Sequence, residues 1–423
     1  MDPFSILNQV ASAPNAFKEN EPGSREALIA HSHLARGRTR NPKLNHPAHF
    51  LDRGKRTSSQ FHTTSNSAIR NLTFSLLIPQ PSQSATIRLA VGVRLFQQLK
   101  EAAPTRLTSV ALSEKTGVDV NLLTRLARHL VAMNVLAFHL GAFHATALSN
   151  GLVEERYQHS ILFCYDATRP AFNGLPAYFK KNAYQSPTLA GTYGPFQEAH
   201  GMELPFFEWV VAMPPQLRHF NSFMTAYRAG KANWFEEGFY PVYQRPIRGS
   251  DAEIGEALLV DVGGGRGHDV IAFVALYGDL SGKVLLQDRE SVVARISECA
   301  EGRPFEVQAY DFFTPQPVKG ARAYCFHSIL HDWCDEDSVR ILKDVVPALD
   351  RGVSRVLFNG IVISEEKSTL AATSMDMMML ARFSARERTE VEWREILERV
   401  GLMVVRIVTY PGVSENLIEA ELA

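Results

Sequence analysis

The sequence predicts an α/β protein in which a doubly wound, largely parallel sheet occupies the C-terminal part and a mainly helical domain precedes it. Short apolar stretches after residue 257, separated mostly by helical stretches, predict the sheet. The first of these stretches runs directly into a glycine-rich turn, as expected for a ligand-binding α/β fold. Apolar residues at helical spacing through residues 84–230 predict the helical domain.

Composition and charge exclude several classes of protein. The 423 residues suit two or three domains, and 44 Lys and Arg against 45 Asp and Glu leave a net charge of -1, which disfavours nucleic acid or an anionic membrane as a partner. The four cysteines form no Cys-x-x-Cys pair and are too few for a disulfide framework. No apolar run approaches the roughly 20 residues of a membrane-spanning helix. We expect a folded cytoplasmic protein without a membrane partner.

Two segments precede the helical domain. Residues 1–33 predict a short helical leader, whereas residues 34–83 are basic and lack apolar periodicity, with eight Lys or Arg and one acid between residues 34 and 70. Because such a composition buries no core, we interpret this segment as a disordered insertion or a product of imperfect gene prediction. A nucleic-acid or partner-binding arm is the alternative, which the scarcity of aromatic residues disfavours. Without residues 34–70 the net charge is -8.

The helical domain begins with a winged helix-turn-helix pattern. Its elements are a helix over residues 84–104, a helix with a tight turn at Thr116-Gly117, a helix with Leu122, Leu126, Leu130 and Met133 on one face, and a hairpin over residues 137–145. The last of these helices carries only Arg125, Arg128 and His129 as basic groups. Since a DNA-recognition helix usually has a basic face, we favour a protein-protein module over a DNA reader.

The rest of the helical domain, residues 152–230, is rich in aromatic residues, which build either core or a pocket for a flat ligand. The domain ends near residue 231, ahead of a loop-like stretch. The candidates for a substrate pocket are Phe220 and Met224 here, and Trp333, Met379 and Phe383 further along the chain. Phe220, Met224, Met379 and Phe383 suit the core equally well, because Met and Phe at helical spacing usually pack there, whereas Trp333 suits a clamp on an aromatic ligand, either substrate or cofactor.

The sheet domain, residues 231–423, offers six strand candidates: 258–262, 284–287, 306–309, 323–326, 355–363 and 403–408. Two helices have clear start signals. The acids of residues 335–337 suit the first turn of a helix with Val339 and Leu342 on its apolar face. Thr389 with Glu392 predicts a capping box for a helix that ends at Gly401.

The glycine-rich turn is the strongest motif. It reads Asp261-x-Gly263-x-Gly265-x-Gly267, and His268 stands where a dinucleotide fingerprint needs a third small residue. This spacing is instead the pattern of S-adenosylmethionine (SAM) sites, in which Gly263, Gly264 and Gly265 let the backbone approach the ligand closely.

Acids at the ends of the next two strands extend this site. Asp288 closes the second strand, where a carboxylate accepts both ribose hydroxyls of a nucleoside. Asp311 ends the third strand and is placed to accept the adenine amino group, with Phe312 packing on the ring. Either Asp taken alone suits a strand-end cap, whereas their combination with the turn predicts a cofactor site.

His331 follows the fourth strand within His331-Asp332-Trp333. It sits at the carboxyl end of a parallel strand, where open α/β sheets place their ligands, and this position favours chemistry over a structural role. The acids that follow it are explained by the start of the helix, so we expect no metal site.

These motifs, in this order, resemble the caffeate-type, cation-independent (class I) SAM-dependent O-methyltransferases, and fungal members that act on aromatic polyketides are the most similar. The resemblance is carried by residues 259–267, Tyr310-Asp311-Phe312, His331-Asp332-Trp333 and Arg386-Glu387-Arg388-Thr389. It implies a Rossmann-like SAM-binding domain with SAM as cofactor. It also implies that the winged-helix domain forms a homodimer in which the partner subunit helps to close the substrate pocket.

By position, the resemblance implies that His331 is the general base and that Glu387 orients it. A phenol has a pKa near 10 and imidazole one near 6.5, so a phenol needs a base, and the phenolate can then attack a sulfonium methyl without a metal. A second family glutamate falls at Gly360, where Asn359 or a substrate group would have to substitute. His327 stands where plant relatives commonly place a lysine near the adenine.

We therefore expect a homodimeric SAM-dependent O-methyltransferase that acts on a phenolic hydroxyl of a small aromatic secondary metabolite, most naturally a polyketide. A catalytically silent dimeric regulator that binds SAM or a metabolite is the first alternative, and Gly360 is its best support. A DNA-binding regulator that uses the winged helix is the second. We expect no nucleic acid partner.

Overall fold

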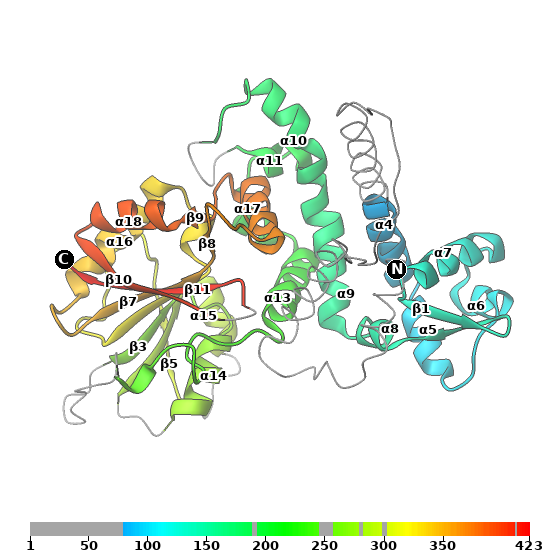
Figure 1. Ribbon diagram of the computed structural model, residues 1–423, viewed down its shortest axis with the longest axis horizontal. Coiled ribbons are helices and arrows are strands. Elements are labelled where there is room, and N and C mark those ends of the chain that lie inside the picture. Colours follow the sequence, from blue (N-terminus) through cyan, green and yellow to red (C-terminus); the bar gives the residue numbers. More distant parts are fainter. Residues whose placement is uncertain (1–78, 188–192, 245–256, 279–281, 298–302, 411–412) are drawn as a thin grey trace, which may run out of the picture. The chain divides into compact units, whose positions relative to one another are not determined.

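The computed structural model describes residues 79–187, 193–244, 257–278, 282–297, 303–410 and 413–423 (Figure 1). These residues form two compact units. Unit 1 contains Ala171–Phe206 and Gly230–Ala423, and unit 2 contains residues 79–170 and Phe207–Ala229. The expected leader and most of the basic segment lie outside the described residues, but residues 79–83 already belong to a helix.

Unit 2 begins with four helices and a hairpin: α4 (Pro79–Gly92), α5 (Leu95–Ala102), α6 (Ser109–Thr116), α7 (Val120–Ala132), β1 (Leu136–His139) and β2 (Ala142–Ala145). The strands pair antiparallel and turn through Leu140 and Gly141, both at positive φ, as the sequence predicted. The tight turn after α6 is also confirmed, because Gly117 caps that helix in the left-handed conformation.

Two details of this region differ from the prediction. The single helix expected over residues 84–104 is two helices, because Arg94 adopts a left-handed φ of 54° between them. The helical spacing continues across the break because α4 and α5 bury their apolar residues in one core. The expected apolar face of α7 is only partly right: Leu130 is buried as predicted, but Leu123 and Ala127 are buried where Leu122 and Leu126 were expected, and Leu122 is 47% exposed.

The remaining helices of the N-terminal half are α8 (Ala147–Gly151), α9 (Glu155–Leu162), the π-helix η1 (Phe163–Thr168), α10 (Arg169–Lys181), α11 (Pro195–His200), α12 (Phe206–Ala212) and α13 (Pro214–Arg228). Within unit 2, α13 packs along α9. Phe163 lies 5.4 Å from the ring of Phe220 and 5.6 Å from that of Phe223. Some of the aromatic residues in this region therefore pack against one another in the core of unit 2.

Unit 1 is organised around a seven-stranded sheet in the order β10-β11-β7-β6-β3-β4-β5. Its strands are β3 (Ala257–Val262), β4 (Lys283–Asp288), β5 (Glu306–Ala309), β6 (Ala323–His327), β7 (Arg355–Gly360), β10 (Leu402–Thr409) and β11 (Asn416–Leu422). The strands from β7 to β5 are parallel, and β11 lies antiparallel between β7 and β10. The predicted doubly wound α/β fold is confirmed, although its sheet is mixed.

Two corrections concern the end of the chain. The expected strand over residues 355–363 ends at Gly360, and Val362–Ile363 (β8) leaves the sheet to pair with Arg388–Thr389 (β9). The central strand β11 was not predicted. Its Glu419 is fully buried, with Arg355 and Arg406 of the neighbouring strands 3.3 Å from its carboxylate oxygens. Because these partners belong to other strands, the sequence of β11 by itself is typical of a polar surface segment.

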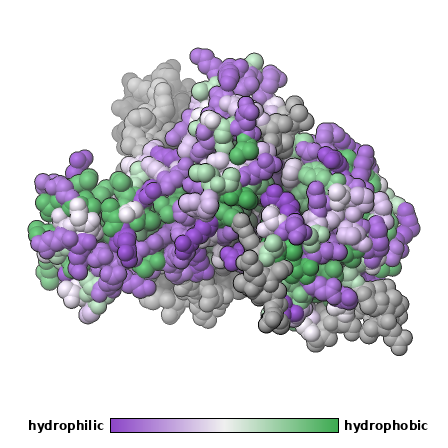
Figure 2. Space-filling model, turned by 180° about the vertical axis from the view of Figure 1, so that it is seen from behind, coloured by the Kyte–Doolittle hydropathy of each residue, from purple (hydrophilic) through white to green (hydrophobic). Residues whose placement is uncertain are grey.

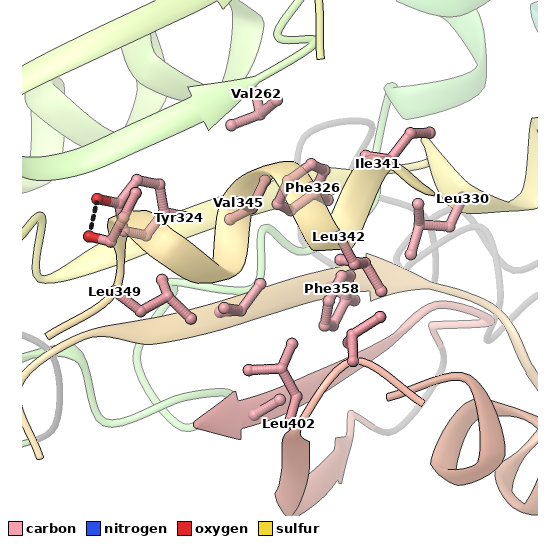
Figure 3. Close-up of a cluster of buried hydrophobic side chains, with 14 of the residues drawn as sticks. Val262, Tyr324, Phe326, Leu330, Ile341, Leu342, Val345, Leu349, Phe358 and Leu402 are labelled. Atoms are coloured by element: carbon pink, nitrogen blue, oxygen red, sulfur yellow. Dashed lines mark hydrogen bonds between the residues drawn. The ribbon is translucent and has the colours of Figure 1, made fainter. Parts of the chain in front are cut away.

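Helices cover both faces of the sheet: α14 (His268–Tyr277), α15 (Glu290–Ser297), α16 (Asp335–Val345) and α18 (Glu390–Glu398), while α17 (Leu370–Phe383) leads to β9. Alternate strand residues enter different cores. Val260 and Val262 join α16 and α18, whereas Leu259 packs with α14. Figure 3 shows α16 over the first core, where the rings of Phe326 and Phe358 stack 5.6 Å apart.

Candidate functional site

The glycine-rich turn lies where β3 ends. Gly263, Gly265 and Gly267 all adopt positive φ, which only glycine accepts without strain. A Cβ on Gly264 would lie 2.4 Å from Oδ2 of Asp261, and one on Gly263 would lie 2.6 Å from Cδ1 of Ile329. The three predicted glycines therefore form a cradle of bare backbone, and no atom lies within 4 Å of a Cβ built on Gly265.

The carboxylate of Asp288 closes one side of this cradle. It accepts hydrogen bonds from the N–H of Gly265 at 2.9 Å and from that of Arg289 at 2.7 Å. Burial raises the pKa of Asp288, and the two N–H groups oppose that shift. The N–H of Tyr310 donates to the carbonyl of Asp288 at 2.8 Å, so the exposed Asp311 follows directly beside it.

These residues fit the nucleoside part of SAM. A carboxylate at the end of the second parallel strand suits ribose hydroxyls, and a bare glycine turn admits close approach of a ligand to the backbone. The ring of Phe312 lies 3.9 Å from a Cβ built on Gly263, which brings an aromatic face to the same cradle. The structure thus brings five of the expected cofactor residues together, namely Gly263, Gly264, Gly265, Asp288 and Phe312, with Asp311 next in the chain.

His327 is held by acids. Its Nδ1 lies 2.5 Å from Oδ2 of Asp269, and its Nε2 lies 3.4 Å from Oε2 of Glu415. Glu415 also pairs with Lys231, whose Nζ is 3.0 Å from Oε1. Burial raises the pKa of Glu415, but Lys231 and His327 outweigh it and hold the pKa well below its ordinary value. The expected contact of His327 with adenine stays a prediction.

His331 is presented by a short 3-10 turn, η3 (Leu330–Asp332), which follows β6. Its Nδ1 lies 2.8 Å from Oε1 of Glu387, and its Nε2 lies 3.5 Å from Oδ1 of Asp332. The side chain of Glu387 is 1% exposed, and its backbone N–H donates to Oδ1 of Asp376 at 2.9 Å. Two carboxyl groups therefore face the two ring nitrogens of one imidazole.

This arrangement shifts the pKa values of both His331 and Asp332. Burial on its own lowers the pKa of His331, but Glu387 and Asp332 outweigh it and raise the pKa to about 9. Burial raises the pKa of Asp332 to about 7, although the nearby His331 and Arg382 act in the opposite direction. The site thus holds a strongly basic imidazole next to a weakly acidic carboxyl group.

Gly360 carries no side chain toward this pair, and no atom lies within 4 Å of a Cβ built on it. Asn359, named above as a substitute for the second family glutamate, donates from its side-chain amide to the carbonyl of Asn416 at 3.1 Å. The second carboxyl group beside His331 is that of Asp332. In the sequence, Asp332 stood out only as part of a motif, so its contact with the imidazole of His331 was not predicted.

The expected substrate residues fall into both units. Trp333 lies edge-on to Phe312 and Phe313, at 5.7 and 4.8 Å. Met379 and Phe383 are buried on α17. Phe220 and Met224 belong to α13 of unit 2, and the structure describes them with that unit alone.

Within the described ranges, no group of three or more His, Cys, Asp or Glu side chains is placed to hold a metal ion. In the same part of the chain, none of the helices has the length and apolar character needed to cross a membrane.

Known proteins share both the sequence and the fold. Residues 244–403 match the family model of the O-methyltransferase domain. The O-methyltransferase mpaG of Penicillium roqueforti is 51% identical over 419 residues, which cover 99% of this chain and 98% of that protein. LepI solved in complex with SAM has a TM-score of 0.75 at 24% identity, covering 86% of this chain and 94% of that chain. OxaC solved with sinefungin and meleagrin has a TM-score of 0.73 at 21% identity, covering 100% and 99%.

Proposed function

The chain belongs to the SAM-dependent O-methyltransferase family, and from that premise we propose that it methylates a phenolic hydroxyl of an aromatic secondary metabolite of the polyketide class. SAM is the cofactor. One observation carries the proposal: Nδ1 of His331 lies 2.8 Å from Glu387, on the turn that begins beside the glycine cradle. Ile329, two residues before His331, lies against Gly263.

In this proposal the nucleoside of SAM lies against the glycine cradle. The backbone of residues 263–265 follows the ligand closely, the carboxylate of Asp288 accepts the ribose hydroxyls, and Asp311 accepts the adenine amino group. Phe312 packs on the adenine ring, and His327 lies at the same edge of the sheet. The N–H of Gly265 supports this role by fixing Asp288 at 2.9 Å.

His331 takes the phenolic proton at Nε2, because Glu387 lies in hydrogen-bonding range of Nδ1 at 2.8 Å, whereas Asp332 lies farther from Nε2, at 3.5 Å. The imidazolium that forms is stabilised by the carboxylate of Glu387, which needs no rearrangement when the charge arrives. When bound, SAM supplies a methyl group on a positively charged sulfur, which the phenolate oxygen accepts. The proton then leaves His331 for solvent, which restores the base.

The substrate class follows from the chemistry around the base. Trp333, Met379 and Phe383 of unit 1 form the proposed apolar and aromatic lining for the substrate. A flat aromatic ring suits such surface, and a phenol suits a base whose pKa of about 9 lies close to that of a phenol near 10.

We also propose that the protein forms a homodimer through unit 2. Several of its large apolar side chains are exposed: Val110 at 58%, Leu122 at 47%, Phe138 at 52% and Leu140 at 86%. Figure 2 shows green, hydrophobic patches among the purple surface. Because a dimer interface would cover these exposed apolar side chains, sedimentation should give twice the chain mass. Phe138→Glu should shift the protein to a monomer, and a native protein that sediments as a monomer contradicts the proposal.

The proposed reaction is tested with methyl-labelled SAM and a panel of polyketide phenols, with label transfer and S-adenosylhomocysteine (SAH) release as readouts. His331→Ala should lower turnover about 100- to 10,000-fold while SAH binding stays intact. If no phenol accepts the methyl group while SAH still binds, the silent regulator remains as the better description. An active His331→Ala variant would remove the base assignment.

A further inference from the structure

Arg388 is a fully buried cation at the back of the His331 turn. Its side chain is 0% exposed, and its guanidinium makes four hydrogen bonds. It donates to the carbonyls of Leu330 at 2.6 Å and Trp333 at 2.8 Å, to the hydroxyl of Ser338 at 3.1 Å, and to the carboxylate of Asp335 at 3.0 Å. Two of the four partners are therefore backbone carbonyls of the turn itself.

Those two carbonyls belong to residues on either side of His331 in the chain. Leu330 precedes it, Trp333 ends the turn, and the whole 3-10 segment spans only Leu330–Asp332. A 3-10 turn of this length has few hydrogen bonds of its own, so outside contacts decide its conformation. The guanidinium thus fixes the backbone on both sides of the imidazole.

Arg388 also belongs to the strand that delivers Glu387. It follows Glu387 directly in the chain, and its backbone pairs with Val362 in the β8–β9 ladder. One residue therefore joins the two partners of the 2.8 Å contact: its backbone fixes the position of Glu387, and its side chain fixes the turn of His331.

A buried cation with this many partners is costly to keep. Burial lowers the pKa of Arg388 and Asp335 opposes that shift, so the side chain stays charged. Lysine could not replace the contacts, because its single ammonium lacks the planar fork that reaches two carbonyls and a carboxylate together. Apolar packing would serve stability alone equally well, which favours a positioning role for the arginine.

We propose that Arg388 is the positioning residue of the general base: by holding the carbonyls of Leu330 and Trp333, it keeps the imidazole of His331 in hydrogen-bonding range of Glu387. This inference rests on the proposed role of His331. It goes beyond it by naming what holds the pair together in a chain that has Gly360 where a second glutamate was expected.

Arg388→Lys tests the inference, with Arg386→Lys as its matched control. Arg386 also pairs with Asp335, through the other carboxylate oxygen at 2.6 Å, but no hydrogen bond joins it to the turn among those described for its side chain. We expect Arg388→Lys to lower kcat roughly 100-fold on the high-pH plateau, where His331 is neutral in both proteins, as a misplacement of about 1 Å does, with SAH affinity changed less than about twofold. Arg386→Lys should keep native kcat.

The pKa of the His331 imidazole, measured by NMR without substrate, separates positioning from general destabilisation. The groups that face this imidazole are Glu387, Asp332 and the more distant Glu415, and Arg382 acts on Asp332. If the turn relaxes away from Glu387, the pKa falls from about 9 toward the ordinary value near 6.5. A melting temperature that falls while the pKa and kcat stay native would overturn the inference.

Ser338→Ala provides a second variant in case Arg388→Lys does not fold. It removes one guanidinium contact and the hydroxyl's own 3.5 Å hydrogen bond to the carbonyl of Leu330, and it leaves the charge in place, so kcat on the high-pH plateau should fall several-fold and the His331 pKa should fall with it. Native values for both would also overturn the inference. His331→Ala separates the two proposals: if it stays active, the base assignment fails, whereas if it is inactive while the Arg388 and Ser338 variants behave as native, only the positioning role fails.

Discussion

Nδ1 of His331 and Oε1 of Glu387 lie 2.8 Å apart although 56 positions separate the two residues in the chain. The contact joins the turn after β6 to the residue before β9, and it sets the chemistry of the imidazole. A carboxylate at Nδ1 holds the ring in one orientation, and the proposed reaction uses Nε2 for the phenolic proton.

Glu387→Gln keeps the size of the partner and removes its charge. We expect the pKa of His331 to fall from about 9 toward its ordinary value, and kcat on the high-pH plateau, where the imidazole is neutral in both proteins, to fall about 100-fold because the imidazolium loses its nearest counter-charge. Both are read from kcat measured against pH. SAH titration serves as the control, because Glu387 has no role in the proposed cofactor site. A pH profile that keeps its native midpoint would show that Glu387 does not face the base in solution.

The glycine cradle makes a prediction with an internal control. Gly264→Ala would place its Cβ 2.4 Å from a carboxylate oxygen of Asp261 and 2.8 Å from its Cγ, so the turn must shift. We expect SAH affinity to fall at least about tenfold. Gly360→Ala, also at a strand end, meets no atom within 4 Å and should bind SAH normally. Calorimetric titration of both variants checks the pair, and equal affinities would place the cofactor elsewhere.

The buried ion pair of Lys231 and Glu415 is expected to contribute to the free energy of unfolding. Their side chains are 9% and 6% exposed, so Lys231→Met leaves a buried carboxylate without its nearest cation and should cost about 3 kcal/mol. Because the folded pKa of Glu415 is depressed, this stability is present above the unfolded pKa and is lost as pH falls through the folded one. The difference between the variant and the native protein should therefore be largest at neutral pH.

Lys283→Met is the matched control for that measurement. Lys283 and Glu306 are also 3.0 Å apart, but their side chains are 54% and 55% exposed. Water screens such a pair, so its loss should cost less than about 1 kcal/mol in urea unfolding. Similar losses for the two lysine variants would mean that burial does not set the strength of the Lys231 pair.

The parallel strands and the backbone of the glycine-rich turn could be predicted because their signals are local. A buried strand that ends in Gly263-Gly264-Gly265 specifies its own turn, and Asp288 and Asp311 mark the ends of later strands by position. The wing hairpin is local in the same way, since Leu140 and Gly141 both take the positive φ of its turn.

The missed features depend on partners far away in the chain. Strand β11 is buried because arginines of two neighbouring strands neutralise Glu419, which its own sequence does not reveal. From the sequence, Arg388 had no role beyond its place in a family motif, because the carbonyls to which it donates, those of Trp333 and Leu330, lie 55 and 58 positions earlier in the chain. The apolar face of α7 failed for a different reason, because adjacent Leu122 and Leu123 allow two helical faces.

The native pH dependence tests the proposed base most directly. A pKa of about 9 means that His331 is mostly protonated at neutral pH and accepts a proton only in its neutral form, so kcat/KM should rise about tenfold between pH 7 and pH 8 and level off above pH 9. The midpoint is a property of His331 and Asp332 together, because the two groups are close enough for the protonation of one to change the pKa of the other. Ionisation of the phenol near pH 10 would also make the rate rise with pH. The residual activity of His331→Ala separates the two causes, since the variant keeps the phenol and loses the imidazole: a native midpoint near 9 that moves to the phenol's own value near 10 in the variant belongs to His331, and a midpoint that is the same in both proteins excludes His331 as its source.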